Sequence, residues 1–392
     1  MIPYGRQDIS QADVDAVCEV LASDFLTQGP KVPAFEAAVC AVTGARFGVA
    51  VNSATSALHL ACLALGVGPG DVVWTSPVTF VASANCARLC GAEVDFVDID
   101  PDTFNLCPVA LEAKLTDAEA AGRLPKVLIP VHMCGQSPAM ERIASLARAK
   151  GIRIIEDASH AIGARYQGVP VGACAHSDIT VFSFHPVKIV TSGEGGMAMT
   201  NDPVLAERMA DLRSHGITRD AARMRQEPDG PWYYEQLALG LNYRLTDLHA
   251  ALGLSQLSRL DAFVARRNAL ANRYDRLLGG LPVDLPGRTE GAYSAFHLYV
   301  VRLHDARLRR KVFEFMRCAG IGVNVHYIPV HLQPYYRDLG FAPGDFPASE
   351  AYYARAITLP LYAGLSDGDQ DRVVAVLGEA IRSVSADTVE MP

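Results

Sequence analysis

Between residues 46 and 200, short apolar runs typical of strands alternate with segments of helical spacing. The strand-like runs cover residues 47–51, 71–75, 94–97, 126–131 and 153–157, and the helical segments cover residues 57–65, 81–90 and 140–150. Short buried strands joined by crossover helices form a mostly parallel sheet that is covered on both faces. The alternation therefore predicts an α/β fold whose ligands bind at the carboxyl ends of the strands.

Further elements are predicted on both sides of this region. Capping residues and apolar spacing indicate helices at residues 8–23 and 32–42, and a polar stretch at residues 219–234 indicates a loop. Residues 246–278 have the pattern of one long helix that leads into a second domain. We predict a large domain over residues 1–250 and a smaller one over residues 251–392. The smaller domain is expected to contain strands at residues 296–303 and 321–326 and helices at residues 306–318 and 369–383.

The composition excludes several classes of partner. The net charge is −8, so no basic field favours nucleic acid or an anionic membrane surface. No uninterrupted apolar run reaches the length needed to cross a bilayer. Nine cysteines without any Cys-x-x-Cys pair are typical of reduced thiols. We therefore expect a cytoplasmic protein.

One lysine has an unusual position in the sequence. Lys188 lies between two β-prone runs, residues 180–182 and 197–200, and is followed by small residues up to Gly196. Burial lowers the pKa of a lysine, and the neutral amine can attack a carbonyl carbon and form a Schiff base. The alternative is a loop lysine whose amine reaches water, and this stretch alone favours that alternative.

Two other stretches add groups with chemical meaning. Residues 52–56, Asn-Ser-Ala-Thr-Ser, lie between the first strand and its helix, where small hydroxyl residues suit a phosphate. Plain helix capping explains the same residues. Asp157 ends a buried strand, where a carboxylate needs a partner such as a protonated pyridine nitrogen. Its alternative role is that of a cap for residues 158–160.

Taken together, the three features match the attachments that pyridoxal 5′-phosphate requires. The turn at residues 52–56 would anchor the phosphate, Asp157 would face the ring nitrogen, and Lys188 would bind the aldehyde carbon.

Dinucleotide binding, metal binding and serine-hydrolase chemistry are disfavoured. Residues 193–196 lack dinucleotide-binding spacing, the histidines are scattered so that no metal site is predicted, and no Gly-x-Ser-x-Gly motif occurs.

The sequence also resembles the DegT/DnrJ/EryC1/StrS sugar-nucleotide aminotransferases almost from end to end. The most specific stretches are residues 52–58, 156–161, 183–196 and 240–247. The resemblance implies the aspartate-aminotransferase-type fold (fold type I), in which a large domain with a mostly parallel sheet binds pyridoxal 5′-phosphate beside a smaller C-terminal α/β domain.

The resemblance implies roles for individual residues. Lys188 is the implied catalytic Schiff-base lysine, and Asp157 is the implied partner of the ring nitrogen. The remaining implied cofactor contacts are Ala54, Thr55 and Ser183 at the phosphate, Phe80 on the ring, His160 near the ring hydroxyl, and Asn242 at the phosphate of a neighbouring subunit. The contact from Asn242 implies a homodimer with shared active sites. Some relatives carry histidine in place of the lysine and are dehydratases, whereas this chain keeps Lys188.

Within the family, residues 184–188 and 323–331 are most similar to the transaminases of pseudaminic acid synthesis. This similarity implies transfer of an amino group from L-glutamate, which becomes 2-oxoglutarate, to a UDP-4-keto-6-deoxy-N-acetylhexosamine. The implied product is UDP-4-amino-4,6-dideoxy-N-acetyl-β-L-altrosamine. The residues implied around the UDP-sugar are Tyr4, Asp24, Phe25, Leu26, Thr27, His326 and Tyr327. A packed terminus would equally explain Tyr4, and a strand end would explain His326.

Two alternatives to this reaction remain. The substrate could be another keto nucleotide sugar, dTDP- or GDP-linked and with the keto group at C4 or C3. The chain could also be a regulatory protein that binds the cofactor without turnover.

Overall fold

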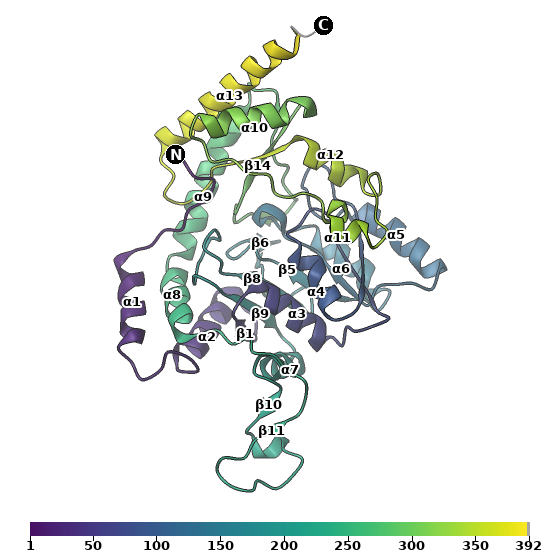
Figure 1. Ribbon diagram of the computed structural model, residues 1–392, viewed down its shortest axis with the longest axis vertical. Coiled ribbons are helices and arrows are strands. Elements are labelled where there is room, and N and C mark those ends of the chain that lie inside the picture. The colour runs from purple at the N-terminus through teal and green to yellow at the C-terminus, as the bar shows by residue number, and fades with distance from the viewer. Residues whose placement is uncertain (390–392) are drawn as a thin grey trace.

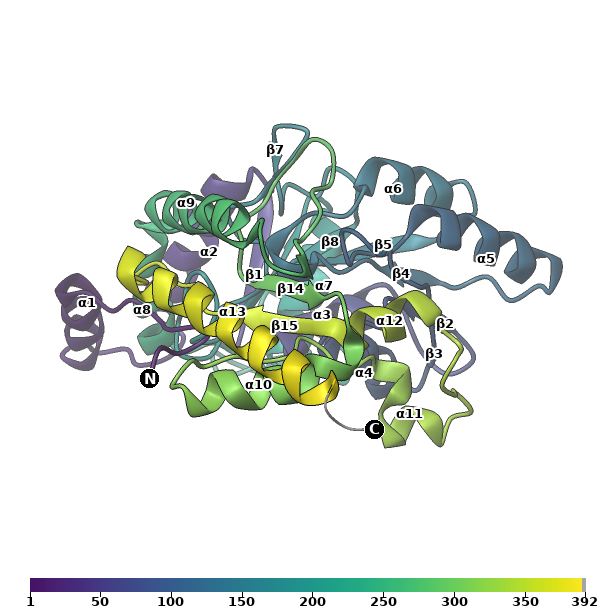
Figure 2. The same cartoon turned by 90° about the horizontal axis from the view of Figure 1, so that it is seen from above.

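A seven-stranded sheet forms the centre of the fold (Figures 1 and 2). In the computed structural model, which describes residues 1–389, the strand order is β1-β9-β8-β5-β4-β2-β3. Strand β9 is antiparallel to both of its neighbours, and the other pairs are parallel. The mostly parallel α/β sheet is thereby confirmed. Its strands are β1 (Phe47–Val51), β2 (Val72–Thr75), β3 (Glu93–Phe96), β4 (Val127–Ile129), β5 (Arg153–Asp157), β8 (Ile179–Ser183) and β9 (Gly196–Thr200).

Helices cover both faces of this sheet because successive strand side chains point to opposite sides. Ile155 packs among side chains of α3 and α4 on one face, whereas the preceding Ile154 packs with α6 on the other. The first face is covered by α3 (Ala54–Ala64), α4 (Ala82–Leu89) and α7 (Pro203–Arg213). The second face is covered by α2 (Lys31–Thr43), α5 (Pro108–Ala120), α6 (Met140–Arg148), α8 (Asp247–Leu257) and the first half of α9 (Leu260–Leu278).

A second hydrophobic core lies in the C-terminal part of the chain. It surrounds a three-stranded antiparallel sheet of β12 (Val283–Asp284), β14 (Tyr299–Leu303) and β15 (Ala356–Leu359). Helices α10 (Arg309–Cys318) and α13 (Asp367–Val389) cover this sheet, and Ile2 packs into the same core. Helix α9 contributes Val264 to the core of the large sheet and Tyr274 to this one. Since α9 takes part in both cores, the domain boundary at residue 250 stays a prediction.

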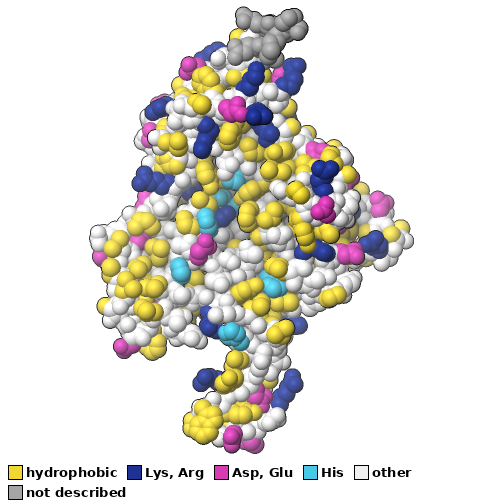
Figure 3. Space-filling view, in the orientation of Figure 1, with side chains coloured by type: hydrophobic (Ala, Val, Ile, Leu, Met, Phe, Trp, Pro, Cys, Tyr) yellow, Lys and Arg dark blue, Asp and Glu magenta, His cyan; other side chains and the backbone are white. Residues whose placement is uncertain are grey.

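Shorter elements connect these layers. A small sheet joins β6 (Arg165–Tyr166), β7 (Val169–Pro170) and β13 (Ala292–Tyr293). Helix α11 (Pro334–Arg337) lies beside α4 (Figure 2), where the Tyr336 hydroxyl donates to Asn85 at 2.6 Å, and Ser349 of α12 (Pro347–Arg355) donates to Asp98 after β3 at 2.6 Å. Strands β10 (Ile217–Thr218) and β11 (Glu235–Gln236) close the base of a projection at the bottom of Figure 1. The projection contains the loop predicted at residues 219–234. Its tip carries hydrophobic side chains (Figure 3), and Trp232 is 69% exposed.

Two predicted elements are wrong. Residues 246–278 form two helices, because Ser258 and Arg259 make a turn in which Arg259 leaves helical geometry and pairs with Asp8 and Asp13 of the N-terminal segment. Residues 321–326 form no strand. Their backbone groups pair with distant segments only at isolated positions: Gly322 N–H donates to the Ile2 carbonyl, and Asn324 exchanges two hydrogen bonds with Thr358, so no continuous ladder develops. Helices α5, α7, α11 and α12 were not predicted.

The Asp247 carboxylate ties the turn after α1 (Gln11–Leu21) to the start of α8. Asp247 is fully buried, and its Oδ2 and Oδ1 accept hydrogen bonds from the backbone N–H of Gly29 at 2.8 Å and Lys31 at 2.7 Å. This turn contains residues 24–27, four of the residues that were predicted to bind substrate. Asp247 therefore fixes their position relative to the large sheet.

Replacing Asp247 by alanine is expected to lower the free energy of unfolding by about 2–3 kcal/mol, because two backbone donors lose their acceptor. Urea denaturation monitored by circular dichroism measures this change. The exposed Asp117 on α5 supplies the control, since Asp117→Ala should change the same quantity by less than about 0.5 kcal/mol. Equal effects of the two substitutions would contradict the role given to Asp247.

Candidate active site

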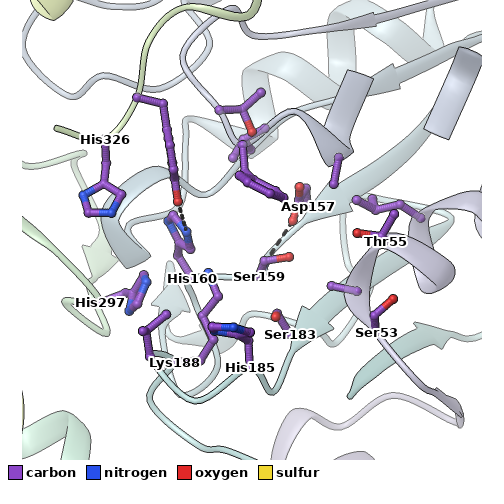
Figure 4. Close-up of a pocket in the computed structure, with 18 of the residues that line it drawn as sticks. Ser53, Thr55, Asp157, Ser159, His160, Ser183, His185, Lys188, His297 and His326 are labelled. Atoms are coloured by element: carbon purple, nitrogen blue, oxygen red, sulfur yellow. Dashed lines mark hydrogen bonds between the residues drawn. The ribbon is translucent and has the colours of Figure 1, made fainter. Parts of the chain in front are cut away.

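A cavity of about 430 Å³ opens at the carboxyl ends of the parallel strands. Its walls come from the segments that follow β2, β4, β5 and β8, from the first turn of α3, and from residues of the C-terminal domain. Figure 3 shows histidine side chains gathered around the middle of this face, and Figure 4 shows the residues that line the cavity. The location agrees with the prediction that ligands bind at this edge of the sheet.

Lys188 lies in the loop after β8 and its side chain lines the cavity (Figure 4). Phe184 closes the loop, because its N–H donates to the Gly195 carbonyl at 2.9 Å and its carbonyl accepts from Ser192 N–H at 2.9 Å. No hydrogen bond or ion pair joins the Lys188 amine to another side chain within residues 1–389. Burial lowers the pKa of Lys188 to about 8, and the charge of Asp157 opposes this shift. The amine is therefore closer to its neutral, nucleophilic form than an exposed lysine is.

Asp157 ends β5 and presents its carboxylate to the same cavity. Its Oδ2 accepts a hydrogen bond from Ser83 Oγ at 2.6 Å, and its Oδ1 accepts one from Ser159 N–H at 3.1 Å. The hydroxyl of Thr79 lies 2.7 Å from Ser83 Oγ and extends this chain of hydrogen bonds. The bond from Ser159 shows that the capping role considered for Asp157 also occurs. A buried carboxylate held in this way is oriented and its charge is stabilised by local donors.

The N-terminus of α3 faces the cavity and offers an anion site. Ser53 caps the helix, since its Oγ accepts from Ser56 N–H at 3.1 Å. Ala54 and Thr55 line the cavity, and their N–H groups precede the first intrahelical bonds. Strand β9 comes very close to this turn, because a Cβ at Gly196 would lie 2.5 Å from the backbone nitrogen of Ala54. Only glycine permits that approach.

Four histidines line the cavity: His185 belongs to the loop of Lys188, and the other three are His160, His297 and His326 (Figure 4). His160 Nε2 lies 3.2 Å from the Tyr327 hydroxyl, and the ring of His160 lies 4.4 Å from that of His297. The Nδ1 atoms of His160 and His297 are buried without a partner. Burial lowers the pKa of both rings well below the usual range, with Lys188 adding to the effect, and it lowers the pKa of His326 to about 4. All three rings are therefore neutral at pH 7.

Aromatic residues from distant parts of the chain complete the cavity wall. Phe80 follows β2, is 58% exposed, and has its ring 6.2 Å from that of Tyr327. Tyr4 comes from the N-terminal segment and has its ring 5.4 Å from that of His326. The Nδ1 atom of His326 lies 2.9 Å from the Thr358 hydroxyl, which holds the ring in place. Three of the predicted substrate residues thus lie beside the predicted cofactor residues.

The structure brings most of the predicted site residues together, and others lie elsewhere. The ones that line the cavity are Tyr4, Ala54, Thr55, Phe80, Asp157, His160, Ser183, Lys188, His326 and Tyr327. Asp24, Phe25, Leu26 and Thr27 are exposed in the turn after α1 and are absent from the lining. Asn242 is also exposed and pairs through its backbone with Ser214. The roles implied for these five residues stay predictions.

Sequence reasoning missed Ser83 and His297. Ser83 is buried on α4, and nothing in its local sequence distinguishes it from a packing residue. His297 interrupts the apolar run at residues 296–303, and this interruption was the available signal. Its position is fixed by Arg267 of α9, whose Nη1 donates to the carbonyls of Phe296, His297 and Leu361 at 3.1, 3.2 and 3.0 Å.

The residues of the cavity fit pyridoxal 5′-phosphate. An anion site at the start of α3, a buried carboxylate and an amine of lowered pKa face one space, and the unpartnered Nδ1 of His160 offers a further polar contact.

Within residues 1–389, no three His, Cys, Asp or Glu side chains gather so that they could hold a metal ion. None of the described helices is long and apolar enough to cross a membrane.

Comparison with known proteins identifies the family. Residues 7–378 match the DegT/DnrJ/EryC1/StrS aminotransferase family. The chain is 40% identical over 389 residues to the spore coat polysaccharide biosynthesis protein SpsC of Bacillus subtilis (strain 168), and the match covers 98% of this chain and 97% of SpsC.

Solved structures give the same result. Spr1654 from Streptococcus pneumoniae, in its PMP-form, superposes with a TM-score of 0.91 at 33% identity, covering 98% of this chain and 100% of that one. PseC from Helicobacter pylori, an aminotransferase involved in the biosynthesis of pseudoaminic acid, has a TM-score of 0.89 at 30% identity, covering 97% and 99% of the two chains. The predicted fold and cofactor are confirmed. The chain belongs to the DegT/DnrJ/EryC1/StrS aminotransferase family, has fold type I, and uses pyridoxal 5′-phosphate.

Proposed function

We propose that this aminotransferase moves an amino group from L-glutamate to C4 of a UDP-4-keto-6-deoxy-N-acetylhexosamine. The products would be 2-oxoglutarate and UDP-4-amino-4,6-dideoxy-N-acetyl-β-L-altrosamine, a step of pseudaminic acid biosynthesis in the cytoplasm. The observation that carries the proposal is the cavity in which Lys188, Asp157 and the first turn of α3 face one space. The similarity to PseC over nearly the whole chain supports the choice of sugar.

The residues of the cavity would have different roles toward the cofactor. Ala54, Thr55 and Ser183 would hold the cofactor's phosphate, and Asp157 would face its ring nitrogen. When bound, pyridoxal 5′-phosphate supplies a ring that accepts the electron pair of the reacting carbon. Phe80, which lines the same cavity, would cover one face of that ring.

The Lys188 amine is the proton carrier in this scheme. In its neutral form Nζ can take the proton from the carbon that carries the amino group of L-glutamate, and it can return a proton to C4 of the sugar in the second half of a ping-pong cycle. Burial favours the neutral amine, whereas the charge of Asp157 favours the ammonium. The neutral rings of His160, His297 and His326 add no positive charge around the amine.

The proposed substrate contacts come from two groups. Tyr4, His326 and Tyr327 line the cavity and would contact the sugar. Residues 24–27 and Asn242 are exposed away from the lining, and we propose that they act in a homodimer with shared sites, where Asn242 reaches the cofactor phosphate of the neighbouring subunit.

A second candidate is transamination of a different keto nucleotide sugar, dTDP- or GDP-linked and with the keto group at C4 or C3. The chain is 40% identical to SpsC, whose name refers to spore coat polysaccharide biosynthesis and specifies no sugar, and this relative is the reason for keeping a second candidate. A regulatory protein that binds the cofactor without turnover is less well supported. Lys188, whose pKa is lowered, and Asp157 line the same cavity, and this arrangement suits catalysis.

The reactivity of Lys188 should follow its lowered pKa. In the cofactor-free chain, its modification by trinitrobenzenesulfonate should increase through a midpoint near pH 8, compared with about 10.4 for an unperturbed lysine. Asp157→Asn removes the charge that raises the pKa of Lys188, so the midpoint should move to lower pH. Peptide mass spectrometry measures the rate at this lysine. An unchanged or higher midpoint in Asp157→Asn would contradict the assignment.

Lys188→Ala should abolish the borohydride-reducible link between the chain and its cofactor, because no other amine lines the cavity formed by the described residues. Lys311 is exposed, and Lys311→Ala serves as the matched control that keeps the link. The label is located by peptide mapping after reduction. Label retained at another lysine in Lys188→Ala would show that the assignment is wrong.

The purified protein should be yellow, lose its colour with L-glutamate and regain it with 2-oxoglutarate. A panel of UDP-, dTDP- and GDP-linked 4-keto sugars, together with 3-keto analogues, is then offered to the colourless form. The expected result is that the UDP-4-keto-6-deoxy-N-acetylhexosamine restores the colour fastest. Restoration by a dTDP- or GDP-linked sugar alone would select the second candidate, and colour that persists under L-glutamate would exclude transamination from this donor.

A further inference from the structure

Asn324 of the C-terminal domain lines the active-site cavity, although it was not predicted as a site residue. It lies in the segment that follows α10, two residues before His326, which lines the same cavity. Two backbone hydrogen bonds fix its position. Its N–H donates to the carbonyl of Thr358 on β15 at 3.3 Å, and its own carbonyl accepts from Thr358 N–H at 2.8 Å. The side chain of Asn324 therefore projects from a backbone that is anchored to the C-terminal sheet.

Two further hydrogen bonds fix the orientation of the Asn324 amide. Its Oδ1 accepts from the N–H of Val325 at 2.8 Å, so the oxygen end of the amide is satisfied by the backbone. Its Nδ2 lies 3.3 Å from Nε2 of His326. An amide NH₂ group can only donate, so Nε2 of His326 is the acceptor in this pair.

The tautomer of His326 follows from this contact. A neutral imidazole carries one proton, so a ring that accepts at Nε2 carries its proton on Nδ1. Nδ1 then donates to the Thr358 hydroxyl, which lies 2.9 Å away. Burial, with a smaller effect from the charge of Lys188, lowers the pKa of His326 to about 4, which agrees with a neutral ring. Both nitrogens of His326 are thereby used, and the ring offers no free donor to a ligand.

The free donor at this wall of the cavity belongs to Asn324. Its Nδ2 has a second N–H, for which residues 1–389 supply no acceptor. The surroundings of this donor are uncharged and largely apolar. Val325 lines the cavity, and the rings of Tyr4 and Tyr327 lie 5.4 and 4.9 Å from that of His326. A carboxylate would need a cation here, and these residues carry none, whereas a neutral carbonyl with a methyl group matches the donor and the apolar surface.

We propose that Asn324 is a specificity-determining residue that donates a hydrogen bond to the carbonyl oxygen of the sugar's 2-acetamido group, whose methyl group packs against Val325 and Tyr4. The proposal rests on the proposed function, because it concerns the N-acetylhexosamine of the same site. The acetamido oxygen is separated from C2 by three bonds and a hydroxyl oxygen by one. A donor placed for the former does not serve the latter, so Asn324 selects N-acetylated sugars over 2-hydroxy sugars.

Binding measures this selection without turnover. Isothermal titration calorimetry on the colourless, cofactor-loaded enzyme compares UDP-N-acetylglucosamine with UDP-glucose, which differ at C2. We expect the wild type to bind UDP-N-acetylglucosamine about ten-fold more tightly, as for one hydrogen bond in a partly buried site. Asn324→Leu removes the donor at similar volume and should bring the two dissociation constants within about two-fold of each other. Asn324→Asp, whose carboxylate cannot donate, should lose the preference as well.

Thr358→Val is the matched control. It removes the hydroxyl that holds His326 but keeps the Asn324 amide, so the preference for UDP-N-acetylglucosamine should persist. Loss of colour with L-glutamate shows that each variant is folded and loaded with cofactor. If Asn324→Leu slowed that reaction as much as it weakened binding of the nucleotide sugar, Asn324 would serve the amino donor instead and the proposal would be wrong.

Three other results would overturn the proposal. They are equal or undetectable binding of the two nucleotide sugars by the wild type, a preference that persists in Asn324→Leu, and loss of the preference in Thr358→Val. Failure of the proposed function has a different signature. In that case no UDP-linked keto sugar restores the colour, even where the preference for UDP-N-acetylglucosamine depends on Asn324.

Discussion

The convergence of parallel strands at one edge of the sheet is the constraint on which the active site depends. Asp157 ends β5, Ser183 ends β8 and Thr79 follows β2, so residues separated by about a hundred positions face one cavity. The buried carboxylate of Asp157 then requires local donors, and Ser83 and Ser159 supply them. The hydrogen bond from Ser83 fixes α4 relative to β5 and thereby shapes the wall opposite Lys188.

The state of Lys188 results from opposing effects of the same environment. Enclosure in the cavity disfavours the ammonium, while the negative charge of Asp157 favours it, and burial is the stronger effect. The glycine at position 196 contributes indirectly, because its missing side chain lets β9 approach the turn that begins α3. Lys188 and the anion site line the same cavity, and the close approach of β9 to this turn belongs to that arrangement.

The parts of the fold that local sequence determines could be predicted. Each of the strands β1 to β5 coincides with a short apolar run of the sequence. Thr55 follows the run at residues 47–51, Asp157 ends the run at residues 153–157, and Lys188 follows the run at residues 180–182. The parts decided by distant contacts could not be predicted: residues 321–326 pair with Ile2 and Thr358, and the break before α9 depends on Arg259 pairing with Asp8 and Asp13. Ser83 and His297 were missed for the same reason, because their importance comes from Asp157 and His160.

Helix α9 begins in the core of the large sheet and ends in the core of the C-terminal domain. A continuous helix is stiff, so it cannot serve as the flexible hinge that usually separates two domains. Arg267, near its middle, holds the carbonyls beside His297. Helix α9 thereby couples the two cores rigidly. Loss of packing at either end of α9 would disturb the position of His297 in the cavity. The same coupling would favour cooperative unfolding of the two cores.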